Sequence, residues 1–200
     1  MSRLVTPAPL SFTVRPLSLD EYHRLIDMEF FAPDEHVELI EGYLHTLSPR
    51  RPRHAACLSR LQRLFYACVG SSTVVRSQDP ITLAGSNSEP EPDLVLAKPQ
   101  ADDYARRHPE ASDILLVIEI ADSSLVFDRG TKASLYASAS IPEYWIVNLA
   151  DDCIEVYREP RSVAGGSGEY LTREIARRGD YAAPTGAPAC RLAVSDILPF

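Results

Sequence analysis

The sequence contains no apolar stretch that approaches the roughly 20 residues a transmembrane helix needs. Uninterrupted runs such as Ile114–Ile118 have the length of a single strand. The opening residues, MSRLVTPAPLSF, also lack the long apolar segment of a secretory signal. We therefore expect a cytoplasmic protein that has no membrane partner.

Basic side chains are too few to balance the acidic ones. The chain has 20 lysines and arginines against 28 aspartates and glutamates, which gives a formal net charge of −8. Proteins that hold nucleic acid through many phosphate contacts usually carry a basic excess. Any nucleic-acid partner must therefore be held by a local patch or through metal ions. Lysine is especially scarce. Among the 20 basic residues, only Lys98 and Lys132 are lysines, and the others are arginines.

Cysteine is also scarce, and its spacing is uninformative. Cys57, Cys68, Cys153 and Cys190 are widely separated and form no C-x-x-C pair. This spacing does not fit a zinc finger. Cys57 and Cys68 fall in an apolar helical stretch, which predicts that both are buried as small hydrophobic side chains.

The 200 residues have the composition of one globular domain, with 45% hydrophobic and 24% charged residues. Three prolines indicate an N-terminal arm at 1–17, which leaves 18–200 for the domain. Ser18 and Glu21 have the spacing of a capping box at the start of a helix. The pattern that follows predicts a hairpin at 36–49 with its turn at Glu41 and Gly42, helices at 54–69 and 128–139, strands at 73–76, 80–83, 93–96, 113–120, 143–149, 153–158 and 169–175, and a helical or irregular insert at 101–110. Strands interleaved with helices indicate an α/β (α+β) domain with a mixed sheet.

Three charged residues in the middle of the chain form a pattern that favours a divalent-cation site. Asp93 follows a proline at the start of a strand, Glu119 lies near the end of the most apolar strand, and Lys132 lies in the next helix. A carboxylate at the edge of a buried strand is costly unless it is paired or bound to a metal. Mg²⁺ suits such a site, because it takes one or two carboxylates together with water and substrate phosphate.

Several short motifs follow one another in a definite order along the chain. They are E-L-I-E-G at 38–42, S-P at 48–49, His54, P-D at 92–93, V-I-E-I at 117–120, D-R-x-x-K at 128–132, Tyr136 and E-Y-W-I-V at 143–147. This order resembles the Uma2 family, which belongs to the PD-(D/E)XK nuclease superfamily, and the resemblance covers roughly residues 18–158. Each motif alone is weak, and the ordered set is specific.

This resemblance implies a restriction-endonuclease-like mixed sheet flanked by helices. It also implies hydrolysis of phosphodiester bonds, with DNA as the expected substrate and Mg²⁺ or Mn²⁺ as the cofactor. By position, Asp93 and Glu119 are the metal-binding acids. The usual lysine two residues after the second acid is replaced by Ala121, and the resemblance suggests that Lys132 supplies that charge instead.

Several further assignments stay open at this stage. Glu38 or Glu41 completes the metal shell from the hairpin, with Glu38 slightly favoured because Glu41 precedes Gly42 at a turn. His54 assists from the start of its helix or is an ordinary helix-start residue. A homodimer is expected from analogy with the fold and from the apolar C-terminal segment.

Each functional interpretation also has a structural alternative. In these alternatives, Asp93 only accepts local backbone hydrogen bonds, Glu119 pairs with an arginine, and Lys132 forms a surface ion pair with Asp128. The basic cluster between the hairpin and the next helix contacts phosphate or is solvated; it comprises Arg50, Arg51 and Arg53. Tyr144 and Trp145 are expected in the core or in a dimer interface. The rival to a nuclease is a catalytically inactive member of the same fold that serves as a binding or structural module.

Overall fold

The computed structural model describes residues 14–46, 50–163 and 165–199. Most of the predicted arm, residues 1–13, and the Ser48–Pro49 motif lie outside the described residues. The helices and strands are α1 (Leu19–Asp27), β1 (Val37–Ile40), β2 (Tyr43–Thr46), α2 (Pro52–Cys68), β3 (Val74–Arg76), β4 (Leu94–Ala97), β5 (Ile114–Ala121), α3 (Leu125–Phe127), α4 (Ala133–Ser138), β6 (Glu143–Asn148), β7 (Cys153–Ser162), β8 (Gly168–Arg177), β9 (Tyr181–Ala182), β10 (Leu192–Ala193) and α5 (Val194–Ile197).

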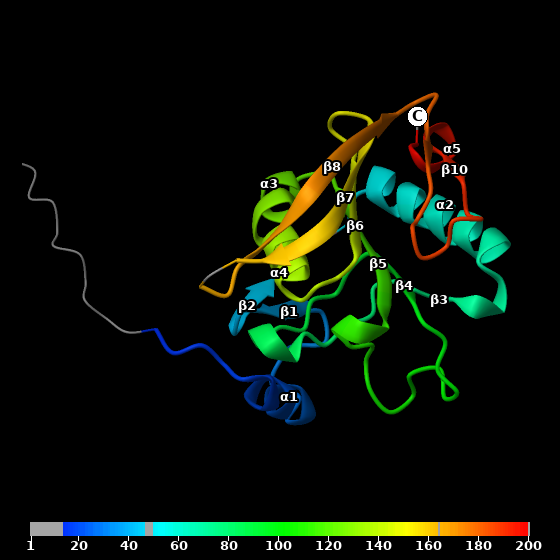
Figure 1. Cartoon of the computed structure of the whole chain (residues 1–200). Helices are drawn as coiled ribbons and strands as arrows, with labels where there is room; N and C mark the ends of the chain where they lie inside the picture. The colour runs from blue at the N-terminus through cyan, green and yellow to red at the C-terminus, as the bar shows by residue number, and fades with distance from the viewer. Residues whose placement is uncertain (1–13, 47–49, 164, 200) are drawn as a thin grey trace, which may run out of the picture.

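A six-stranded mixed sheet forms the centre of the fold, with the strand order β3-β4-β5-β6-β7-β8 (Figure 1). Strands β5 and β6 are parallel, and the other neighbours are antiparallel. The parallel pair needs a crossover, which the helical stretch containing α3 and α4 provides. The predicted mixed sheet flanked by helices is therefore confirmed.

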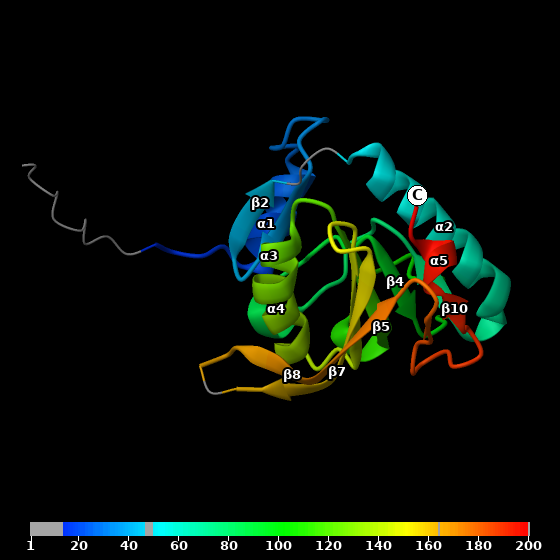
Figure 2. The same cartoon turned by 90° about the horizontal axis from the view of Figure 1, so that it is seen from above.

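Helices cover the two faces of the sheet, as the view from above shows (Figure 2). One face packs against α2 and α5, and the other packs against α3 and α4. Side chains of β5 alternate between these layers, so that Ile118 faces α2 and Val117 faces α4. Trp145 and Tyr144 are fully buried on opposite faces of β6, which confirms the prediction that they belong to the core.

The N-terminal elements follow the sequence pattern closely. Ser18 caps α1, and Glu21 completes the capping box. Strands β1 and β2 form the predicted antiparallel hairpin. Its turn places Glu41 and Gly42 at positive φ, which glycine adopts without steric cost. A side chain at Gly42 would also collide with Pro16, so this glycine lets the segment before α1 approach the hairpin.

Two predicted elements differ in the structure. Residues 80–83 form only isolated bridges, at Thr82 and Leu83, and do not join the main sheet. The local backbone is held instead by a turn that passes through the left-handed Asn87. The helix predicted at 128–139 begins earlier, with α3, and is widened into a π-helical turn at Asp128–Lys132 before α4. The insert at 101–110 is irregular, which was one of the two expected outcomes.

The C-terminal segment corrects two expectations. Cys68 is not an isolated hydrophobic side chain, because it forms a disulfide with Cys190 across 122 residues of sequence. Only the folded chain brings this pair together, and no local spacing reveals it. The apolar C-terminal residues Val194, Ile197 and Leu198 are buried in the protein's own core, so they are not available to a dimer interface. Among the described residues, no helix has the length and apolar character needed to cross a membrane.

Candidate functional site

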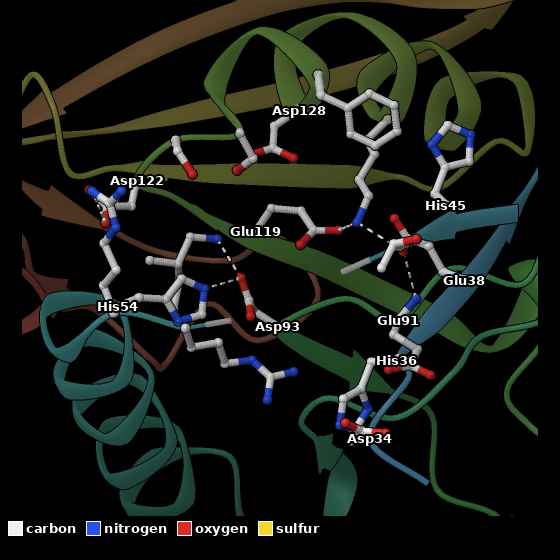
Figure 3. A pocket seen from close by; sticks show the side chains of 18 residues that line it. Asp34, His36, Glu38, His45, His54, Glu91, Asp93, Glu119, Asp122 and Asp128 are labelled. Atoms are coloured by element: carbon white, nitrogen blue, oxygen red, sulfur yellow. Dashed lines mark hydrogen bonds and ion pairs between the residues drawn. The ribbon is translucent and has the colours of Figure 1, made fainter. Parts of the chain in front are cut away.

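A cavity of about 660 Å³ opens between the hairpin, the start of α2, the ends of β4 and β5, and the helical stretch that contains α3. Its wall is rich in ionisable side chains (Figure 3). The lining residues are Asp34, His36, Glu38, His45, Thr46, Arg50, Arg51, His54, Glu91, Asp93, Glu119, Ile120, Asp122, Ser123, Ser124, Phe127, Asp128 and Lys132. The five predicted site residues therefore all line one cavity, although they come from five separate elements or loops.

Asp93 and Glu119 lie side by side on neighbouring antiparallel strands. The register that pairs Leu94 with Ile118 places Asp93 directly before β4 beside Glu119 of β5. Asp93 Oδ2 accepts the backbone N–H of Ile120 at 2.8 Å, which fixes this alignment. Both carboxylates thus share the face of the sheet that is covered by α3 and α4, and they open onto the same cavity.

Glu119 is held by a buried hydrogen-bond network. Its Oε1 atom accepts Lys132 Nζ and the Tyr136 hydroxyl, each at 2.8 Å. Lys132 Nζ also lies 3.2 Å from Glu38 Oε2, which in turn accepts the backbone N–H of Glu91 at 3.1 Å. Lys132 is only 5% exposed and forms no ion pair with Asp128, so the surface ion pair considered from the sequence is not present.

Burial and charge act in opposite directions on this network. Burial raises the pKa of Glu119 above its usual range, and the charge of Lys132 only partly offsets that effect. Burial alone would lower the pKa of Lys132, but the carboxylates of Glu119 and Glu38 outweigh it and raise the pKa. Lys132 is therefore a fixed positive charge at neutral pH and is unsuited to accept a proton.

The π-helical turn positions Lys132. Such turns interrupt α-helices and are frequently found at functional sites. Arg129 in the turn binds the buried carboxylate of Glu155 on β7, and Tyr144 donates a hydrogen bond to the carbonyl oxygen of Asp128 at 3.2 Å. These contacts attach the turn to strands β6 and β7 of the sheet. Lys132 therefore reaches Glu119 from the helical stretch that follows β5.

His54 and the arginine cluster have distinct roles at the cavity mouth. His54 Nε2 lies 3.0 Å from Asp93 Oδ2, while its Nδ1 atom is buried without a partner among the described residues. Arg53 donates to the carbonyl oxygen of Leu149 and has a structural role. The other two members of the predicted cluster, Arg50 and Arg51, line the cavity.

The structure also decides between the two hairpin acids and adds a residue. Glu38 is buried and lines the cavity, whereas Glu41 is exposed at the turn.

Asp128 was considered from the sequence only as a partner of Lys132, yet it is a buried carboxylate that lines the cavity and accepts a hydrogen bond from Ser124 Oγ at 2.5 Å. Burial raises the pKa of Asp128 to about 6. Its position at the start of D-R-x-x-K was the sequence signal for such a residue.

Comparisons with known proteins show the family of the chain and agree with its fold. The Uma2 family model, described as "Putative restriction endonuclease", matches residues 19–195. The chain belongs to the Uma2 family. A crystal structure of "a putative nuclease belonging to DUF820" from Anabaena variabilis ATCC 29413 aligns with a TM-score of 0.70 and 16% sequence identity, over 91% of this chain and 97% of that one. No curated protein matches the chain.

The donor set of this Uma2 protein fits a small divalent cation. Within the described residues, no three histidine, cysteine or acidic side chains are grouped to hold a metal ion by themselves. Mg²⁺ does not need such a cage, because water and substrate phosphate complete its shell. Asp93 Oδ1 and Glu119 Oε2 accept no hydrogen bond from any described residue, and both residues line the cavity. The residues that would hold the ion are therefore Asp93 and Glu119, with Glu38 beside them.

Proposed function

We propose that this Uma2 protein is a nuclease that hydrolyses phosphodiester bonds in DNA with the help of Mg²⁺ or Mn²⁺. One observation carries the proposal. Asp93 and Glu119 lie at adjacent strands of the sheet and line one cavity, and Lys132 donates a hydrogen bond to Glu119. Asp93 and Glu119 would hold the cation there, and it would supply charge neutralisation at the phosphate and lower the pKa of a bound water. The family match and the fold of the Anabaena protein support the same reaction class.

Lys132 contributes a fixed positive charge to this reaction. Its ammonium group is held by Glu119 and Glu38 and remains protonated, so it donates hydrogen bonds and does not act as a base. A preorganised donor of this kind stabilises negative charge that develops at a phosphate in the transition state. Lys132 also keeps two buried carboxylates from repelling each other before substrate binds.

His54 and Asp128 complete the proposed machinery. The hydrogen bond between His54 and Asp93 orients the carboxylate, so that its second oxygen faces the cavity. Asp128 lies on the opposite wall, where its carboxylate can accept a hydrogen bond from the attacking water. Arg50 and Arg51 at the mouth provide the local basic patch that an acidic protein needs for contact with phosphate.

The decisive experiment is a cleavage assay on supercoiled and linear DNA with Mg²⁺, Mn²⁺ or EDTA. We expect nicking that requires the cation and falls steeply as salt concentration rises, because only a few phosphate contacts hold the substrate. The double variant Asp93→Asn and Glu119→Gln serves as the inactive control. Cleavage that persists undiminished in EDTA would exclude this mechanism.

The rival function is a nuclease-fold protein that binds a partner without catalysis. The net charge of −8 and Ala121 at the usual lysine position favour it. Calorimetry with Mn²⁺ separates the two possibilities. A nuclease binds the ion in wild-type protein and loses this binding in the Asp93 variant, whereas a protein that binds neither Mn²⁺ nor Mg²⁺ belongs to the rival class.

A further inference from the structure

Strand β8 forms a long open edge of the main sheet. It pairs with β7 on one side, and no described strand pairs with it on the other. The view from above places it at the margin of the molecule (Figure 2). The opposite edge, β3, has only 3 residues, whereas β8 has 10. Backbone groups at its two ends are bonded within the chain, because Gly168 N–H donates to Ser134 Oγ and Arg177 N–H donates to Asp180 Oδ2. Between these ends the edge presents backbone groups that can pair with another strand.

The side chains of β8 are unusual for an edge that faces water alone. Leu171 is 54% exposed and Ile175 is 47% exposed. Neither proline nor lysine, which commonly protect edge strands from pairing, occurs in Gly168–Arg177. The apolar pair is flanked by Glu169 near one end of the strand and by Arg177 at the other, and the second acid of the strand, Glu174, pairs with Arg158 of β7.

These residues are arranged for antiparallel pairing of β8 with itself. When two copies are related by a twofold axis at Arg173, Glu169 of each copy lies opposite Arg177 of the other, and Leu171 lies opposite Ile175. At the axis, Arg173 of one copy would lie opposite Arg173 of the other. Its charge is compensated within each chain, because the guanidinium group donates a hydrogen bond to Glu155 Oε2 at 2.7 Å. Arg177 forms no ion pair with any described residue, whereas Glu169 pairs at the surface with Arg161 of its own chain. In the paired arrangement Arg177 would therefore join a carboxylate that already accepts one guanidinium group, as Glu155 does with Arg129 and Arg173.

We propose that β8 pairs antiparallel with β8 of a second copy of this chain, which joins the two sheets into one continuous sheet. The buried C-terminal residues cannot provide the interface, whereas the β8 edge supplies backbone groups, apolar side chains and complementary charges together. This inference does not depend on the proposed nuclease activity. The binding partner is identified by the self-complementary charge order along β8.

The test is the oligomeric state, measured by sedimentation velocity over a dilution series. Wild-type protein is expected to be a dimer at micromolar concentration. Arg177→Glu should weaken the dimer roughly tenfold or more, because it places like charges opposite each other twice in the symmetric interface. The double variant Glu169→Arg with Arg177→Glu should restore the dimer. Arg63→Glu makes the same charge change on the exposed surface of α2 and should leave the dimer unaffected.

A second variant tests the apolar contact independently of charge. Leu171→Lys should give a monomer with an unchanged circular dichroism spectrum, because this side chain is exposed in the isolated chain. A wild-type protein that remains monomeric throughout the dilution series would overturn the proposal. A dimer that persists in both Arg177→Glu and Leu171→Lys would overturn it as well, because the interface would then lie elsewhere.

Discussion

Lys132 Nζ lies 2.8 Å from Glu119 Oε1 and joins the helix after β5 to the strand itself. The usual lysine of the superfamily motif stands two residues after the acid, where this chain has Ala121. The side chain that reaches Glu119 comes instead from the π-helical turn, 13 residues along the chain. The same ammonium group also pairs with Glu38 of the hairpin, so one lysine connects three elements of the cavity.

Replacing Lys132 should separate its charge from its geometry. Lys132→Ala leaves Glu119 and Glu38 buried without their partner, which should lower the free energy of unfolding by about 3–5 kcal/mol and abolish cleavage. Lys132→Arg keeps a positive charge but not the compact ammonium group, so it should recover much of the stability and little activity. Urea unfolding and plasmid nicking measure the two effects. Lys98→Ala is the matched control, since Lys98 is exposed and far from the cavity wall.

Asp93→Asn should remove metal binding while preserving the local fold. The amide oxygen can still accept the N–H of Ile120, but the uncharged group is a poor ligand for a hard cation. We expect cleavage to fall at least about 100-fold and the affinity for Mn²⁺ to fall in parallel. Asp79→Asn, which changes an exposed carboxylate outside the cavity, should alter neither. Activity equal to wild type in Asp93→Asn would remove this residue from the site.

The stability of the protein should decline in acid through Glu155. Burial opposes ionisation of this carboxyl, but hydrogen bonds from Arg129, Asn148 and Tyr157 outweigh it and lower the pKa from 4.5 to about 2. Because the folded state binds this proton less readily than the unfolded state, the stabilisation is fully present above pH 4.5 and is lost as pH falls toward 2. It amounts to roughly 3 kcal/mol.

Glu155→Gln tests this assignment through the melting temperature as a function of pH. The variant should melt below wild type at neutral pH, and the difference should shrink as pH falls through the acid range. Glu174→Gln, which alters an exposed partner of Arg158, should follow the wild-type curve. A wild-type curve that is flat down to pH 2 would contradict the lowered pKa.

The disulfide between Cys68 and Cys190 should contribute measurably to stability. It closes a loop across 122 residues, and such a crosslink typically contributes about 2–4 kcal/mol, mainly by restricting the unfolded chain. Dithiothreitol should therefore lower the urea midpoint of wild type and leave that of Cys68→Ser unchanged. Structural disulfides persist in oxidising compartments, so an intact crosslink in protein isolated from cells would count against the expected cytoplasmic location.

Local chemistry accounts for the elements that could be predicted from the sequence. The capping box at Ser18, the Glu41–Gly42 turn and the long pairing of β7 with β8 all follow from short-range patterns. The π-helical turn and the loss of the strand at 80–83 were not predictable in this way. Both depend on hydrogen bonds to distant segments, which local propensity does not contain.

The sequence by itself determined which residue types were available for the site and the order of the strands that bear them. Tertiary structure alone decided that Glu38 faces the cavity rather than Glu41, and that His54 meets Asp93. It also decided that Lys132 turns inward to Glu119 and away from Asp128. The physical reason is that a buried charge takes the partner that packing brings within hydrogen-bond distance, and that partner lies on another element of the fold.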